Sequence, residues 1–167
     1  MILPCNVVVA SQPASPEDAW ILLAFPFFFI GMWLLITFII SRTGWVRFAR
    51  AYPCPTRPPG TTYVSPYASF SGARYSSVVS GVATEGGLYL RAVLIFSAFH
   101  TPFLLPWSSV TRIEHLDGWL IKGWLLHVKD SVGSFQIRFR PAFEGELRRY
   151  VPVLMNASAS SSFPFIK

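Results

Sequence analysis

The chain has 167 residues, of which 52% are hydrophobic and only 13% are charged, and its formal net charge is +6. A basic chain this rich in apolar residues is more typical of a protein at the inner face of a membrane than of a nucleic-acid binder. Basic residues do not alternate with aromatic residues on one predicted face, as binding of single-stranded nucleic acid requires. We therefore expect no nucleic-acid partner.

An uncharged apolar run from Ala19 to Ser41 is the most informative feature of the sequence. As a helix rising about 1.5 Å per residue it covers roughly 33 Å, enough to cross a hydrocarbon core of about 30 Å. A buried helix of a soluble protein is the weaker interpretation, because a chain of this length offers little protein to surround it. We predict a transmembrane helix over residues 19–41, after a short extracytoplasmic segment over residues 1–18.

The charges on the two sides of the predicted span differ. Residues 1–18 contain no Lys or Arg, whereas Arg42, Arg47 and Arg50 follow the apolar run. Because basic residues that flank a first span stay in the cytoplasm, we expect a single pass through the bacterial inner membrane, with the N-terminus outside. A cleaved signal peptide would need a basic start and a shorter apolar core, so we expect a permanent anchor. The predicted membrane-interface residues are Trp20, Trp45, Arg42, Arg47 and Arg50.

The outer half of the span is rich in phenylalanine, with Phe25 and Phe28 as candidate contacts to a partner or to lipid. Lipid contact is the favoured interpretation of these side chains. The alternative is packing against a neighbouring helix or a pigment-like cofactor. We predict no bound cofactor.

Residues 42–52 are predicted to form a juxtamembrane amphipathic helix. Trp45, Phe48 and Tyr52 follow helical spacing, while Arg47 and Arg50 take the opposite face. Such a helix is expected to lie along the inner membrane surface near anionic headgroups. The alternative is that this segment is the frayed end of the spanning helix. A proline-rich linker over residues 53–61 follows, and its composition predicts an extended, semi-rigid boundary.

Short alternating runs separated by turn residues begin after the linker and predict a series of antiparallel strands. The turn signals are Glu85-Gly86-Gly87, Asp117-Gly118 and Asp130-Ser131-Val132-Gly133. The predicted strands cover residues 67–74, 76–84, 88–90, 93–96, 103–107, 110–116, 124–129 and 135–140.

The final predicted element is a helix that starts at Pro141. Apolar residues fall on one face of it at helical spacing, and Pro152 ends or bends it. We place the folded domain at residues 62–155. The tail over residues 156–167 lacks periodicity, although its Phe163 and Phe165 are apolar enough to contact a partner or lipid.

Short strands followed by one amphipathic helix resemble the pleckstrin-homology (PH)-like pattern. The stretch Gly87–Glu114 resembles the bacterial PH-like or GRAM-like arrangement, in which G-L-Y-L opens a strand and I-P-W-S-x-I closes a later one. The chain is also similar to small bacterial single-span membrane proteins in its Gly44-Trp45 and Ala51-Tyr52-Pro53 juncture. This resemblance implies an α+β fold: one N-terminal transmembrane helix, then a small PH-like antiparallel β-barrel or sandwich capped by the C-terminal helix.

The resemblance says less about a ligand. PH domains that bind phosphoinositides carry several Lys and Arg in the loop joining their first two strands, where this sequence offers only Arg74. The remaining basic cluster is Arg138, Arg140, Arg148 and Arg149. One interpretation is a solvated face. The other is contact with anionic lipid or an acidic neighbouring subunit.

The sequence carries no motif that predicts catalysis. His100, His115 and His127 each lack a neighbour at metal-ligand spacing, and Cys5 and Cys54 are isolated. Phosphate-binding, dinucleotide-binding and nucleophile-elbow motifs are also missing from the sequence. We therefore predict neither an enzyme nor a small-molecule substrate, and we predict no catalytic, cofactor-binding or metal-binding residue.

Two hypotheses of function remain. In the first, the protein is an accessory subunit that packs on and stabilises a larger membrane complex, with respiratory and photosynthetic complexes as examples. In the second, it is a free membrane-anchored adaptor that binds anionic lipid or a peptide. Both hypotheses make membrane lipid a partner.

Overall fold

The computed structural model describes residues 16–42, 44–119 and 121–155. Contacts divide the chain into two compact units, residues 1–35 and residues 36–167. The predicted contacts Phe163 and Phe165 lie outside the described residues.

Helix α1 (Pro16–Arg42) contains the predicted span. It begins at a proline, whose fixed φ suits the first turn of a helix. From Trp20 to Arg42 the helix is long and apolar enough to cross a membrane. Its side chains are exposed around the whole circumference in the first unit, with Trp20, Phe25 and Phe28 between 64% and 72% exposed. A helix apolar on every side is typical of a lipid environment.

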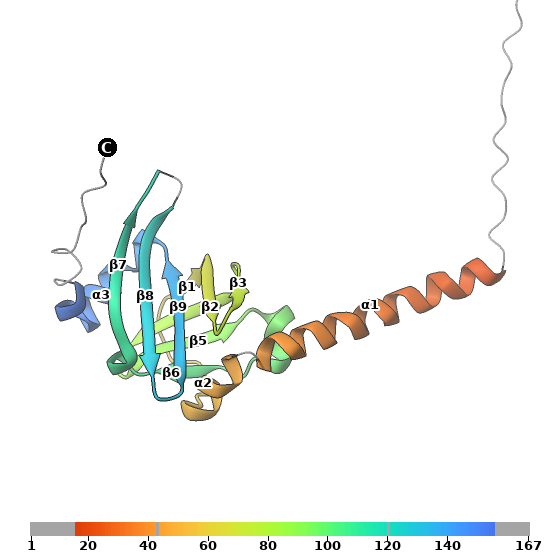
Figure 1. Cartoon of the computed structure of the whole chain (residues 1–167), viewed down its shortest axis with the longest axis horizontal. Helices are drawn as coiled ribbons and strands as arrows, with labels where there is room; N and C mark the ends of the chain where they lie inside the picture. Colours follow the sequence, from red (N-terminus) through yellow and green to blue (C-terminus); the bar gives the residue numbers. More distant parts are fainter. Residues whose placement is uncertain (1–15, 43, 120, 156–167) are drawn as a thin grey trace, which may run out of the picture. The chain divides into compact units, whose positions relative to one another are not determined.

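The second unit is built on two antiparallel sheets, which lie across one another (Figure 1). The four-stranded sheet has the order β1 (Thr62–Ser65), β4 (Val79–Thr84), β5 (Gly87–Ala92), β6 (Phe103–Leu105). The five-stranded sheet has the order β3 (Ala73–Tyr75), β2 (Tyr67–Phe70), β9 (Gly133–Phe139), β8 (Lys122–Asp130), β7 (Val110–Asp117). The sheets form an open sandwich, so the α+β class and the antiparallel strands predicted from the sequence are confirmed.

Alternating side chains of the five-stranded sheet form one wall of the core. In β8, Trp124, Leu126 and Val128 are buried, and Phe135 and Phe139 of β9 are buried in the same way. These strands follow the predicted period of two. Strand β7 departs from it, because its pairing with β8 shifts register between Val110 and Arg112. A bulge of this kind moves the following side chains to the opposite face.

The observed strands differ from the predicted ones in three places. The strand predicted over residues 67–74 is a hairpin of β2 and β3, because Ser71 and Gly72 take positive φ values and turn the chain. Strand β1 was not predicted. The strand predicted over residues 93–96 is instead part of the 3₁₀ helix η1 (Leu94–Phe99), whose Leu94 and Ile95 are 80% and 70% exposed. The apolar run therefore lies on the surface.

The interpretation of residues 42–52 as a membrane-surface helix also needs correction. The helix itself is present as α2 (Trp45–Ala51), but Trp45 is 0% exposed and Phe48 is 1% exposed. The Trp45 ring packs 5.1 Å from the Phe70 ring and 5.0 Å from the Phe103 ring. The apolar face of α2 therefore covers the sandwich, and Trp45 is a core residue and not an interface residue.

The C-terminal helical region packs as its spacing predicts. It consists of the 3₁₀ helix η3 (Pro141–Phe143), helix α3 (Glu144–Tyr150) and a further helical turn over residues 152–155. Phe143 and Leu147 are fully buried, and the Phe143 ring stacks 4.2 Å from the Phe139 ring. This region therefore closes the core beside β9.

Candidate functional site

The second unit contains an open hollow of about 520 Å³ where α1 ends. Phe38, Ser41 and Arg42 contribute from α1, Arg50 from α2 and Phe99 from η1. The two aromatic rings meet edge to face at 5.4 Å. Two consecutive helices and one segment about fifty residues later in the sequence therefore line one concave surface.

The hollow is positively charged. Arg42 and Arg50 both lie in its lining, which includes no Asp or Glu. The Arg42 guanidinium lies over the Phe38 ring, 4.9 Å from its centroid, in cation–π geometry. Among the described residues, no carboxylate lies within ion-pair distance of either arginine. The two guanidinium groups are thus free to bind an anion.

A buried polar cluster holds the wall behind the hollow. The Tyr75 hydroxyl lies 3.3 Å from the Ile40 carbonyl oxygen and 3.2 Å from His100 Nε2. His100 Nδ1 lies 2.8 Å from the Phe96 carbonyl, which can only accept, so Nδ1 carries the proton in the neutral ring. Trp45 Nε1 donates to the Thr101 carbonyl at 2.8 Å. These bonds link the end of α1, α2 and η1.

Burial shifts the ionisation of this cluster. Burial raises the pKa of Tyr75 to about 12, so its hydroxyl stays protonated. Burial also lowers the pKa of His100 below its ordinary value of 6.5, partly offset by the hydrogen bond to the Phe96 carbonyl. At neutral pH the His100 ring is therefore uncharged.

We predict that the second unit loses stability as the pH falls below about 6.5, the ordinary pKa of histidine. The unfolded state binds a proton at His100 more tightly than the folded state, because the folded pKa is the lower one. The contribution of neutral His100 is therefore complete above pH 6.5 and is lost as the pH falls through the folded-state pKa. Urea unfolding of the purified protein in neutral detergent at several pH values measures this loss.

The variant His100→Gln should show a flatter pH dependence across this range. His115→Gln is the control, because His115 is exposed and its ring contacts only the face of Trp124 in the packing described. If the free energy of unfolding of His100→Gln changes with pH as steeply as that of the parent protein, His100 is not the group responsible for the pH dependence.

A second polar cluster links the C-terminal end of α2 by hydrogen bonds to the turn between β8 and β9. Asp130 accepts hydrogen bonds from the Tyr52 hydroxyl and, at 2.8 Å, from the Ser109 hydroxyl. The bond from Tyr52, followed by the bonds from Ser109 and Ser131, lowers the pKa of Asp130 from 3.8 to about 2. Its carboxylate is therefore charged throughout the range in which His100 titrates.

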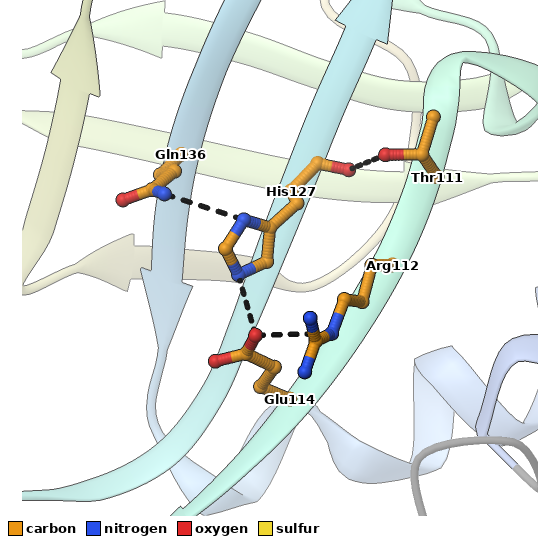
Figure 2. A network of polar contacts seen from close by, with 5 residues as sticks. All are labelled: Thr111, Arg112, Glu114, His127 and Gln136. Carbon is orange, nitrogen blue, oxygen red and sulfur yellow. Dashed lines mark hydrogen bonds and ion pairs between the residues drawn. The ribbon is translucent and has the colours of Figure 1, made fainter. Parts of the chain in front are cut away.

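The exposed face of β7, β8 and β9 carries the polar network in Figure 2. Glu114 Oε1 lies 3.0 Å from Arg112 Nε and 3.2 Å from His127 Nε2, although the latter contact lacks the alignment of a hydrogen bond. His127 Nδ1 lies 3.2 Å from the Gln136 amide nitrogen. Cross-strand pairing creates this cluster, which the isolated position of His127 in the sequence did not suggest. It lies on an exposed sheet face away from the hollow.

The β7–β8 hairpin extends beyond the neighbouring strands (Figure 1) and presents apolar side chains at its end. Trp119 is 91% exposed and Ile121 is 48% exposed. The sequence interpretation treated this region only as a turn. An uncharged Trp-Leu-Ile run between two strands was the available signal.

The predicted basic cluster does not form one site. Arg148 pairs with Glu144 at 2.7 Å, and the Arg149 guanidinium lies over the Tyr150 ring. Arg138 lies in β9, half-buried, whereas Arg140 is exposed beyond the end of that strand. Arg42 and Arg50 of the predicted interface set line the hollow, and Arg47 is exposed on α2.

Comparison with known proteins returns no match from any protein-family model, curated protein or solved structure. Within residues 16–42, 44–119 and 121–155, no three His, Cys, Asp or Glu side chains lie together in a way that could hold a metal ion.

Proposed function

We propose that this protein is a non-enzymatic accessory subunit, anchored by α1 in the bacterial inner membrane, that packs on and stabilises a larger membrane complex. The N-terminus lies outside, and the second unit is a PH-like domain in the cytoplasm. Two crossed antiparallel sheets and a C-terminal helix packed into the core support the PH-like assignment. The basic residues that follow α1 support the orientation.

The exposed Trp119 at the end of the β7–β8 hairpin carries this proposal. A tryptophan that is 91% exposed gains no burial energy in the isolated domain. Tryptophan is enriched among the residues that dominate protein–protein interfaces, where it fills a pocket of the partner. With Ile121 beside it, Trp119 forms an apolar protrusion suited to such a pocket.

Native-size analysis after extraction in a mild detergent tests the proposal. We expect the protein to migrate with a stoichiometric larger complex. Trp119→Ala should weaken the association on the order of thirtyfold, the usual effect of truncating a central interface tryptophan. Val153→Ala is the control, because Val153 is an apolar residue that is also strongly exposed, at 78%, but lies in the C-terminal helical region and not in the β7–β8 hairpin. A lone species of monomer size in native extracts would contradict the proposal.

A second function is favoured by the charged hollow at the end of α1. Its two unpaired arginines support binding of an anionic lipid, as expected of a membrane-anchored adaptor. A monomer in native extracts that binds anionic vesicles would support this function and contradict the first.

A further inference from the structure

We propose that the hollow at the end of α1 is a binding site for the headgroup of an anionic phospholipid. The inference rests on the proposed membrane anchoring by α1, but it does not depend on a partner complex. The site differs from the loop between the first two strands, which binds phosphoinositides in PH domains. Five lining groups carry the inference: Phe38, Arg42, Arg50, Ala98 and Phe99.

The charge of the hollow matches a phosphate. A guanidinium group presents paired N–H donors that fit two phosphate oxygens, and such bonds are stronger than those between neutral groups. Arg42 and Arg50 approach the hollow from different helices and have no carboxylate partner in the described part of the chain. A bound phosphodiester carries one negative charge and has two free oxygens that would accept hydrogen bonds from the two guanidinium groups.

The shape and the walls of the hollow match the rest of a lipid. Its volume of about 520 Å³ falls within the usual range of small-molecule sites, roughly 300–1,000 Å³. Phe38 and Phe99 form apolar walls that suit the glycerol and upper acyl region. Leu94 and Ile95 lie at the start of η1 and are 80% and 70% exposed. These side chains would contact acyl chains and not water.

The position of the hollow at the end of α1 favours a lipid over free phosphate as its ligand. Arg42 is the last residue of α1, the one described helix that is long and apolar enough to span a membrane. The end of such a helix lies at the depth of the phospholipid headgroups. The buried Tyr75 and His100 hold this end of α1 against η1, so the two walls are fixed before any ligand arrives.

Binding measurements on the full-length protein in neutral detergent test the site. The probes are phosphatidylglycerol, phosphatidylcholine with the same acyl chains, and inorganic phosphate, each followed by native mass spectrometry. We expect phosphatidylglycerol to bind about tenfold more tightly than phosphatidylcholine, from two charge contacts at the membrane surface. We expect inorganic phosphate not to compete. Equal binding of the two lipids, or competition by phosphate, would overturn the proposal.

Three variants separate a defined site from general attraction to positive charge. The double variant Arg42→Gln and Arg50→Gln should reduce the lipid preference to within about twofold. Arg140→Gln with Arg149→Gln removes the same charge elsewhere and should keep the preference. Ala98→Trp retains both arginines but fills the hollow from the exposed face of η1, so it should also abolish the preference. Retained preference in Ala98→Trp would show that binding occurs outside the hollow.

Circular dichroism and the unfolding midpoint without lipid establish that each variant is folded. Arg42 and Ala98 are exposed, so we expect native values for both measurements. The proteins are compared without a partner complex. Loss of the lipid site and loss of subunit assembly are therefore distinguishable.

Discussion

Trp45→Ala is expected to reduce the free energy of unfolding of the second unit by about 3–5 kcal/mol, the usual cost of truncating a large buried aromatic residue. Trp45 is fully buried between Phe70 and Phe103, and its Nε1 donates to the Thr101 carbonyl. The substitution leaves a cavity under α2 and an unpaired carbonyl group. Because a domain is typically stable by only about 5–15 kcal/mol, the variant should be close to unfolding.

Urea unfolding followed by circular dichroism in neutral detergent measures this effect. Trp119→Ala is the matched control, because it removes the same side chain from an exposed position and should change stability by less than about 0.5 kcal/mol. A similar small change in Trp45→Ala would mean that α2 does not cover the core. The pair of tryptophan variants also separates folding from association, since Trp119→Ala should weaken binding to the complex while leaving the free energy of unfolding nearly unchanged.

Gly123→Ala is expected to destabilise the second unit by about 2–4 kcal/mol. Gly123 lies in β8, one residue before the Trp124–Phe139 pair that starts the pairing with β9, and has a φ of +138°, which disfavours any residue with a Cβ. A Cβ at this position would lie 2.0 Å from the carbonyl oxygen of Phe139. Backbone cannot move away without breaking the pairing between Trp124 and Phe139, so the strands must separate at this end.

Gly145→Ala is expected to change the free energy of unfolding in the opposite direction, measured in the same way. Gly145 lies in α3, and apart from its chain neighbours and the backbone of its own helix no atom lies within 4 Å of where its Cβ would be. Alanine is favoured over glycine in a helix by up to about 1 kcal/mol, so this variant should be slightly more stable than the parent. A neutral Gly123→Ala would contradict the packing described for β8 and β9, and destabilisation by Gly145→Ala would contradict the open space described beside α3.

The buried cluster of Tyr75 and His100 links the predicted pH dependence of stability to the proposed lipid site. The Tyr75 hydroxyl has one proton and two acceptors, the Ile40 carbonyl oxygen and the neutral His100 Nε2. A protonated His100 would donate to Tyr75, and the hydroxyl proton would then be free for the Ile40 carbonyl. His100, whose protonation below pH 6.5 is expected to reduce stability, is therefore linked through Tyr75 to the end of α1 and to the wall of the hollow.

Local patterns in the sequence predicted the regular elements well. The apolar run predicted a helix long enough to cross a membrane. The alternation in β8 and β9 predicted which of their side chains enter the core. The spacing of Phe143 and Leu147 likewise identified the buried face of the last helix. These predictions succeed because a single element with one buried face imposes its own period on the chain.

The same local patterns misled wherever the partner of an apolar face mattered. The spacing in α2 is equally suited to a membrane surface and to a protein core, and the sandwich supplies the core that buries Trp45. The run that became η1 has the composition of a strand, but the short connection between β5 and β6 turns it onto the surface. What the apolar side chains of α2 and of η1 contact could not be predicted from the sequence of either segment alone.

The sequence by itself determined an apolar helix with basic residues after it and a set of antiparallel strands followed by a helix, because these depend on periodicity within each segment. Only the tertiary structure decided that Arg42 and Arg50 meet Phe99 around one hollow, and that Trp119 remains uncovered. Such sites arise from segments far apart in the chain. Their convergence depends on how the sheets and helices pack.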